Sequence, residues 1–226
     1  MKKIYVVIIL IYFCVTRAFA INPDSISTVY TDGEFVSHYQ IRTKSTIKIT
    51  QDVSDYLVSD FHKTPNNLFN WALKDLGLQE KKKNDLIFIL KSSVTDPKTG
   101  ITHGEFDIVV PYIKTFRDVK VDVIVSKQVA NNAETKVTAN IIYSSLLLKY
   151  AIGTLIFTPR NDSNFLIETN VRIKFGWFFN IFITKQKYKS IVEWRIKKFT
   201  DNIKNECLKR IESGRNKQLL TNIDPQ

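Results

Sequence analysis

The last third of the sequence carries one long amphipathic pattern, over residues 177–213. Apolar residues recur there at steps of three or four, the spacing that places them on one face of an α-helix. The stripe consists of Tyr188, Ile191, Val192, Ile196, Phe199, Ile203, Cys207 and Ile211, with Arg195 among them. A stripe of this length must be buried against another element, and strand-like segments precede it. We therefore expect an α+β fold in which a curved antiparallel sheet packs against one long C-terminal helix.

Six segments before that helix read as strands: five alternate apolar and polar residues with the period of two that marks a half-buried strand, and residues 150–158 are apolar on both faces. They are residues 86–92, 104–112, 119–125, 136–143, 150–158 and 165–175. Polar, turn-forming residues separate several of them, at 95–100, 115–118 and 159–164. Connections this short predict that neighbouring strands run antiparallel.

The segment before these strands predicts one more strand and two short helices. Residues 39–50 alternate like a strand, and residues 53–61 and 65–76 have helical spacing. Thr64 is a natural N-cap and Pro65 suits the first helical position. The expected architecture is a curved antiparallel sheet of about seven strands around the long helix, with two short helices after the first strand.

The first residues have the pattern of a secretory signal peptide. Lys2 and Lys3 form a basic start, residues 4–15 an apolar stretch, and Ala18-Phe19-Ala20 a cleavage site. Arg17 ends the apolar stretch short of the roughly 20 residues that a membrane-spanning helix needs, which disfavours an uncleaved anchor. We expect residues 1–20 to be removed and the protein to be exported, to a periplasm or to the extracellular medium. Residues 21–213 would form one ligand-binding domain and residues 214–226 a flexible tail.

The chain is basic, with a formal net charge of +11. Loss of Lys2, Lys3 and Arg17 with the signal peptide lowers this charge by three, to +8. On an exported protein this charge favours peripheral contact with an anionic membrane surface and disfavours nucleic acid as a partner. Cys207 would be the remaining cysteine, so no intrachain disulfide can form, and we expect it to be a small buried hydrophobe.

A search for catalytic chemistry returns little. The histidines, His38, His62 and His103, are isolated and lack the spacing of a metal site. A nucleophile elbow and a phosphate-binding glycine loop are also absent from the sequence. Glu105 and Asp107 alternate with apolar residues, so we expect them to point to solvent rather than to form an acid–base pair. The sequence indicates no cofactor and no metal, and it favours binding over catalysis.

The order of strand, two short helices, six antiparallel strands and long C-terminal helix resembles the helix-grip fold of the START-related superfamily. That superfamily includes birch-pollen-allergen-like proteins and polyketide cyclases. The resemblance covers residues 39–213 and includes Gly176-Trp177 at the start of the long helix. It implies that a lipid, sterol or polycyclic molecule is held between the sheet and the helix. The glycine-rich loop of the plant allergens is absent, since the relevant segment reads Asp96 to Gly104, so no specific ligand contact is carried over.

We therefore expect an exported, non-enzymatic carrier of a lipid-like or polycyclic hydrophobic small molecule. The candidate ligand-binding residues are Phe106, Ile108, Tyr112, Tyr143, Phe175, Tyr188, Arg195 and Phe199. Arg195 would orient a polar or anionic group of a mostly apolar ligand. Two alternatives stay open: a cyclase or dehydratase on the same scaffold, and an adhesion or scaffold module without a cavity that uses its basic face on anionic lipid or glycan. The sequence does not give the oligomeric state.

Overall fold

The computed structural model describes residues 26–76, 87–110, 114–145, 148–161, 163–177 and 184–221. The predicted signal peptide, residues 1–20, and the candidate site residue Tyr112 lie outside these ranges. None of the helices in the described part of the chain combines the length and the apolar character that crossing a membrane requires.

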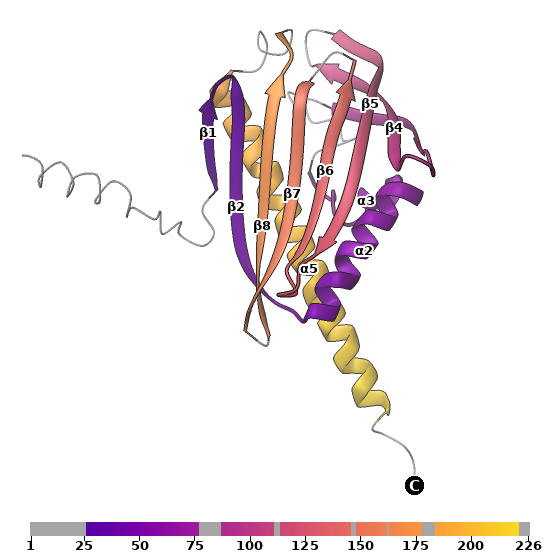
Figure 1. The fold of residues 1–226 in the computed structure, drawn as a ribbon, viewed down its shortest axis with the longest axis vertical. Coiled ribbons are helices and arrows are strands. Elements are labelled where there is room, and N and C mark those ends of the chain that lie inside the picture. The colour runs from indigo at the N-terminus through magenta and orange to yellow at the C-terminus, as the bar shows by residue number, and fades with distance from the viewer. Residues whose placement is uncertain are drawn as a thin grey trace, which may run out of the picture.

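One antiparallel sheet of eight strands forms the body of the molecule (Figure 1). Its order is β1-β2-β8-β7-β6-β5-β4-β3, so every strand pairs with its sequence neighbour except where β2 meets β8. The strands are β1 (Ser27–Thr31), β2 (Glu34–Lys44), β3 (Ile87–Thr95), β4 (Ile101–Val110), β5 (Lys114–Val129), β6 (Thr135–Ser144), β7 (Leu148–Asn161) and β8 (Asn164–Phe175).

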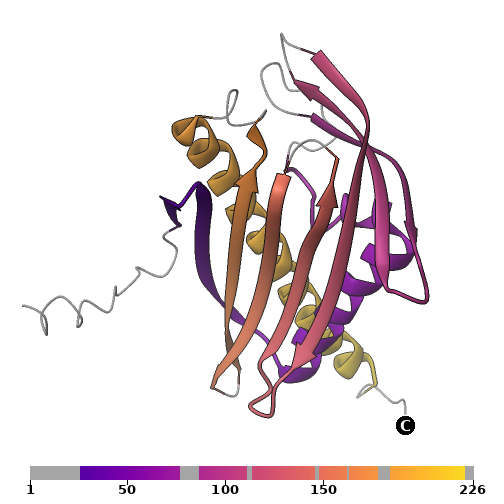
Figure 2. The same cartoon turned by 45° about the horizontal axis from the view of Figure 1, so that its top comes forward.

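Within the described ranges, three helices cover one face of this sheet. They are α2 (Ile47–Lys63), α3 (Pro65–Leu68) and α5 (Lys185–Thr221). The long helix α5 crosses the sheet against β1, β2 and β8, while α2 packs against β5 and β6, and the two helices also contact each other. Figure 2 shows the sheet wrapped around both helices. The structure thus has the expected helix-grip architecture, with eight strands where we expected about seven.

The additional strand belongs to a hairpin that hydrophobic periodicity did not reveal. β1 and β2 are joined by Asp32 and Gly33, which both have positive φ angles, 52° and 76°. A two-residue Asp-Gly turn of this kind matches the twist of the flanking strands. Strand β2 then ends at Lys44, and Thr46 caps α2 by accepting a hydrogen bond from the Ile49 amide at 3.3 Å. The expectation of a strand over 39–50 was therefore wrong in its last part, because the cap starts the helix at Ile47.

Two helix boundaries also differ from expectation. Helix α3 covers only Pro65–Leu68, and turns continue to Leu76, where we expected helix over 65–76. Asn202 of α5 donates through Nδ2 to the carbonyl oxygens of Ala72 and Lys74, at 3.1 and 2.8 Å. These carbonyls therefore bond to α5 instead of continuing a helical ladder. At the other end of the chain α5 runs to Thr221, past the expected end at Ser213, because Gly214 does not end the helix and good helix formers, Lys217, Gln218, Leu219 and Leu220, follow it.

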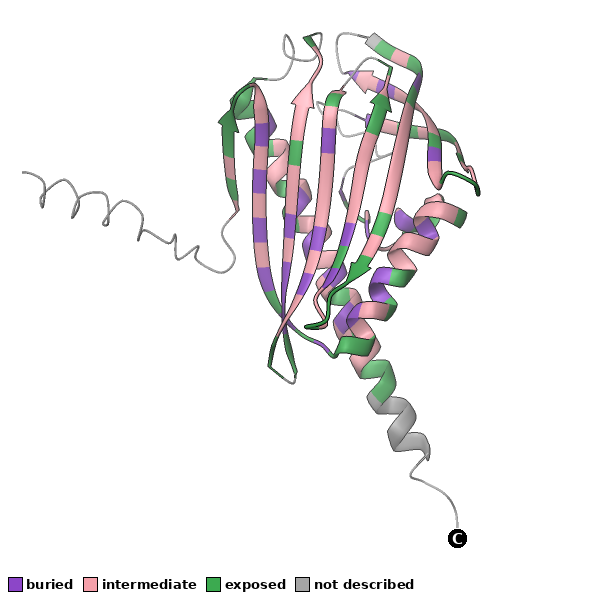
Figure 3. Cartoon of the chain, in the orientation of Figure 1, coloured by how far each residue is buried: buried purple, intermediate pink, exposed green. Residues whose placement is uncertain are grey.

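The main core lies between α5, α2 and the strands β2, β7 and β8. Purple bands along β2 in Figure 3 mark the period-two burial of this strand, whose inward residues include Tyr39 and Ile41. The expected stripe of α5 faces this sheet, since Ile196, Ile203 and Cys207 are all buried. Between these apolar layers, two buried hydroxyl groups satisfy each other: the Oγ1 atoms of Thr169 and Thr200 lie 2.7 Å apart.

Register irregularities bend the other end of the sheet. They occur between β3 and β4, between β4 and β5, and between β5 and β6. A β-bulge increases the local twist and bends the strand that contains it. The bend brings β3 to α2, where Thr95 Oγ1 donates to the carbonyl oxygen of His62 at 3.1 Å. Residues 115–118, which we expected to form a turn, instead lie inside β5 at one of these irregularities.

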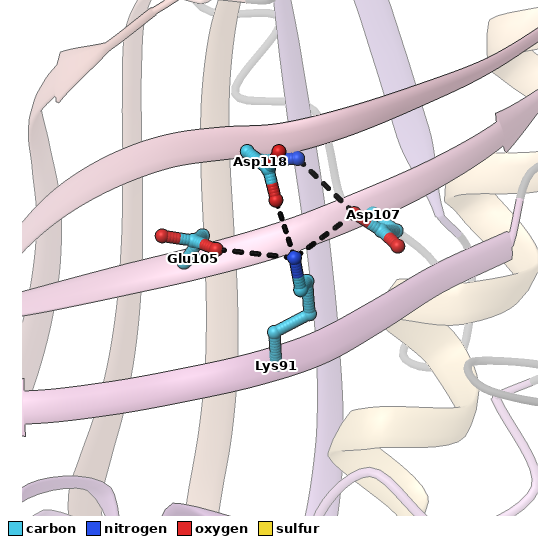
Figure 4. A network of polar contacts seen from close by, with 4 residues as sticks. All are labelled: Lys91, Glu105, Asp107 and Asp118. Carbon is cyan, nitrogen blue, oxygen red and sulfur yellow. Dashed lines mark hydrogen bonds and ion pairs between the residues drawn. The ribbon is translucent and has the colours of Figure 1, made fainter.

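Charged residues gather at these irregularities on the face of the sheet that points away from the helices (Figure 4). Lys91 Nζ lies 3.3 Å from Glu105 Oε1 and 4.0 Å from Asp107 Oδ1, and it also binds Asp118. The hydrogen bond to Asp118 raises the pKa of Lys91, and the same bond holds the pKa of Asp118 below its ordinary value. Glu105 and Asp107 thus lie on the solvent face, as expected, and take part in an ion-pair cluster.

Candidate ligand-binding site

The helices and the sheet enclose two apolar hollows. The first, here called the α5 hollow, has a volume of about 320 Å³. It lies between α2, the segment after α3, the middle of β5 to β8, and α5. Its lining residues are Leu57, Phe61, Leu68, Ala72, Leu73, Leu76, Val125, Val137, Ala139, Gly153, Thr154, Leu155, Thr169, Val171, Arg195, Ile196 and Phe199.

The second hollow, here called the β4 hollow, has a volume of about 290 Å³. It lies under the bent end of the sheet, between β3 to β7 and the α2–α3 connection. Its lining residues are Phe61, Pro65, Leu68, Phe69, Leu73, Phe88, Leu90, Ser93, Thr102, Gly104, Phe106, Ile108, Val121, Val123, Ile141, Ser144 and Leu148. Hydrocarbon side chains dominate both linings, so each hollow favours an apolar guest.

Three residues line both hollows: Phe61, Leu68 and Leu73. They come from the end of α2, from α3 and from the turns that follow it. We call these three side chains the partition. The backbone behind the partition is held to α5 by the two hydrogen bonds of Asn202 described above and by a third from Arg195 Nε to the Leu76 carbonyl oxygen, at 3.3 Å.

Arg195 brings the one charged side chain among the described lining residues of either hollow. It is half-buried on the first half of α5 and lines the α5 hollow beside Ile196 and Phe199. Its Nε donates to the Leu76 carbonyl oxygen, which helps to hold the position of this segment. A guanidinium group is also a planar cation that matches the geometry of a carboxylate or phosphate, so its place in the lining makes it the candidate partner of an anionic ligand group.

The structure brings four of the candidate residues to the hollows. Phe106 and Ile108 of β4 line the β4 hollow, and Arg195 and Phe199 of α5 line the α5 hollow. The sequence placed these pairs on the inward face of a strand and on the buried stripe of a helix. Their roles in binding stay predictions.

Two candidates belong instead to a packed aromatic group at the first turn of α5. Tyr188 is 1% exposed and stacks on Phe35, with ring centroids 3.9 Å apart. Phe175 contacts both rings edge-on, at 5.9 Å. The Tyr188 hydroxyl lies 3.4 Å from Ser37 Oγ, and burial raises its pKa. These rings contact one another, and neither Tyr188 nor Phe175 lines a described hollow.

Tyr143 is the clearest correction. Period-two alternation predicts that it faces inward with Ile141, but its side chain is 52% exposed. The register between β5 and β6 shifts at Ile142: Val123 pairs with Ile141, and the next pair is Asp122 with Tyr143. The extra residue reverses the alternation, so Ser144 turns into the β4 hollow in place of Tyr143.

Sequence reasoning missed several lining residues, and two glycines are the most informative. At Gly153 of β7 an added Cβ would meet nothing within 4 Å, because it would enter the α5 hollow. At Gly104 of β4 an added Cβ would lie 2.8 Å from Cε2 of Phe106, so this glycine makes room for the Phe106 ring in the β4 hollow. A glycine inside a strand often marks such a close approach or gap, and that signal was present in the sequence.

Cys207 lies in the main core cluster and is fully buried. Burial raises the pKa of its thiol to about 11, so the thiol stays protonated at neutral pH. This agrees with the expected role as a buried hydrophobe and argues against a nucleophile. No three described His, Cys, Asp or Glu residues are placed to hold a metal ion.

No protein-family model matches the sequence, and a comparison with curated proteins finds no match. Solved structures that are similar include a START superfamily protein from Mycobacterium smegmatis, 7% identical, with a TM-score of 0.46 over 77% of this chain and 97% of that chain. A major latex-like protein from Panax ginseng is 12% identical, with a TM-score of 0.39 over 77% and 98% of the two chains. A norcoclaurine synthase from Thalictrum is 18% identical, with a TM-score of 0.37 over 78% and 97%.

Proposed function

We propose that this protein is an exported carrier that binds a lipid-like or polycyclic hydrophobic small molecule between its sheet and α5. The observation that carries the proposal is the α5 hollow, a space of about 320 Å³ with hydrocarbon walls and one guanidinium group. A packed scaffold module would fill this space with side chains. Instead Gly153 and Ala139 leave it open on the sheet side.

Partition out of water supplies the affinity in this proposal. Burial of apolar surface contributes about 25 cal/mol per Å². The guanidinium of Arg195 orients the ligand by binding its polar end, as the few polar groups of an apolar pocket commonly do. Carriage requires no bond to be made or broken, and hydrocarbon side chains suit that task.

Export and membrane contact are further parts of the proposal. The N-terminal pattern of Lys2, Lys3, the apolar stretch and Ala18-Phe19-Ala20 supports secretion. The exposed lysines Lys187 and Lys189 on the first turns of α5 support contact with an anionic membrane surface, where a hydrophobic cargo would be collected or released. Mass determination of the protein from the culture medium or periplasm tests the export: a chain that starts at Ile21 is expected, and a chain that keeps residues 1–20 contradicts it.

Native mass spectrometry tests the binding function. The mature protein is purified from a host, offered a lipid extract, and weighed under native and then denaturing conditions. One added mass per chain that is released on unfolding is expected. A protein that stays at its apo mass after exposure to the extract contradicts the proposal.

The role of Arg195 has its own test. Arg195→Ala is expected to weaken an anionic amphiphile tenfold or more and its neutral alcohol analogue far less, because a lost charge-assisted hydrogen bond contributes about 1.5–3 kcal/mol. Arg117→Ala, an exposed arginine on β5 that lines neither hollow, is the matched control. Equal losses for both ligands contradict the assignment. A ligand that leaves chemically changed after incubation would point instead to the cyclase or dehydratase alternative.

A further inference from the structure

The two hollows adjoin at three shared side chains. Both are lined by the partition residues Phe61, Leu68 and Leu73, so they adjoin on opposite sides of these three side chains. Phe61 and Leu73 are half-buried, which leaves their rotamers room to change. Leu73 and Leu68 stand on a short helix and turns rather than on a long regular element.

The backbone under the partition is held more firmly than its side chains. Asn202 binds the carbonyl oxygens of Ala72 and Lys74, and Arg195 binds that of Leu76. Trp71 Nε1 also donates to Asp60 Oδ2 at 2.9 Å, which connects this segment to the end of α2. Opening of the partition would therefore require side-chain rotation but no movement of its main chain.

Size and polarity limit what can occupy both hollows. Each hollow alone, about 320 and 290 Å³, stands at the lower limit of ligand pockets, which span roughly 300–1,000 Å³. Occupied together they fall within that range. The α5 hollow contains the guanidinium of Arg195, whereas the described lining of the β4 hollow is hydrocarbon with three hydroxyl side chains. One end of the joined space therefore suits an anion and the other an apolar tail.

From this geometry we propose that the ligand is a single-chain anionic amphiphile, with its acid group at Arg195 and its hydrocarbon tail passing the partition into the β4 hollow. A flexible chain can bend between these three side chains, whereas a rigid polycyclic molecule would need all three of them to move aside at once. This inference rests on the proposed function and narrows its ligand class.

The inference is tested by calorimetric titration of the mature protein with a series of fatty acids, from octanoate to stearate. Affinity is expected to rise about fourfold for each added methylene, the fold-change that corresponds to ~0.8 kcal/mol, and to keep rising after the α5 hollow is full. The stoichiometry is expected to stay at one fatty acid per protein. A rise that stops at the short chains, or two short chains bound at once, overturns the inference.

A plug in each hollow makes the test specific. Val123→Phe on β5 fills the β4 hollow and is expected to end the rise at a shorter chain; Ile141→Phe on β6 serves if that variant does not fold. Gly153→Leu fills the α5 hollow and is expected to weaken binding of every member of the series. Val129→Phe, the control, makes the same change on β5 at a side chain that is 49% exposed. It should bind the series of fatty acids with the wild-type affinities. If neither Val123→Phe nor Ile141→Phe changes how affinity depends on fatty-acid chain length, the inference is overturned.

The failures of the two proposals differ. A protein that takes up a molecule from a lipid extract but binds no fatty acid retains the carrier function and loses the single-chain assignment. A protein that takes up neither loses both.

Discussion

Alanine at Gly153 and alanine at Gly104 are expected to change stability in opposite directions. Both glycines lie inside strands, and the positive φ angles found among the described glycines belong to Gly33 and Gly100 instead. The backbone at both sites therefore accepts alanine, which removes conformational freedom from the unfolded chain and contributes about 0.5–1 kcal/mol. The two sites differ in what the new Cβ meets.

At Gly153 the Cβ enters open space, so the full gain of about 0.5–1 kcal/mol is expected. At Gly104 it would lie 2.8 Å from Cε2 and 3.4 Å from Cζ of Phe106, so the ring must move. Overpacking of this kind costs about 1–3 kcal/mol, which exceeds the entropic gain and leaves a net loss.

Urea unfolding, monitored by circular dichroism, measures the change in unfolding free energy of each variant. In thermal unfolding, each kcal/mol corresponds to a shift in Tm of roughly 2–4 °C for a chain of this size. A lower unfolding midpoint for Gly153→Ala would mean that the α5 hollow is not open above this glycine. A higher midpoint for Gly104→Ala would mean that the Phe106 ring does not rest there. Either result refutes the part of the cavity description on which the variant depends.

Three further predictions concern buried polar groups. Thr200→Val leaves the buried Thr169 hydroxyl without its partner at 2.7 Å, and we expect the free energy of unfolding in urea to fall by about 1–3 kcal/mol. The double variant with Thr169→Val should recover part of this loss, because neither hydroxyl then remains buried without a partner. Equal losses for the single and the double variant would contradict the pairing. Trp71→Phe keeps the stacking on Tyr56 but removes the donor to the buried carboxyl group of Asp60, and we expect a loss of about 1–3 kcal/mol, with an unchanged midpoint as the contrary result. Burial raises the pKa of Cys207 to about 11, so a thiol reagent at pH 8 should label this thiol only after unfolding. Between about pH 9 and 11 the folded state keeps the thiol proton and the unfolded state loses it, so the free energy of unfolding should fall as the pH rises through this range. Rapid labelling of the native protein would contradict both statements.

The elements with strong periodicity could be predicted from the sequence. The stripe of α5 is buried as expected at Ile196, Ile203 and Cys207, because a helix face that long has no alternative to burial. The six strands from β3 to β8 overlap the segments that the apolar pattern marked as strands, although β5 also takes in the expected turn over 115–118. These elements give the helix-grip architecture, and they place Phe106, Ile108, Arg195 and Phe199 on cavity walls.

The elements that depend on single residues or on distant partners could not be predicted in this way. The β1–β2 hairpin follows from the Asp32-Gly33 turn, whose flanking strand β1 is mostly exposed and so lacks a hydrophobic period. The turns after α3 depend on Asn202, which is far away in sequence. Whether an aromatic residue lines a hollow or fills a core depends on neighbours from other elements, as Tyr188 shows by stacking on Phe35.

The extra residue at Ile142 has a consequence for how a cavity of this kind can change during evolution. The pairing of Ile142, as well as residue type, sets the chemistry of the β4 hollow, because this residue is bulged opposite β5 and so Ser144 rather than Tyr143 faces inward from the end of β6. One residue inserted into β5 opposite Ile142 would restore the alternation and exchange Ser144 for Tyr143 without any substitution in β6. The gain of one codon in a neighbouring strand can therefore replace a small polar wall by a large aromatic one, and so alter ligand choice in a single step.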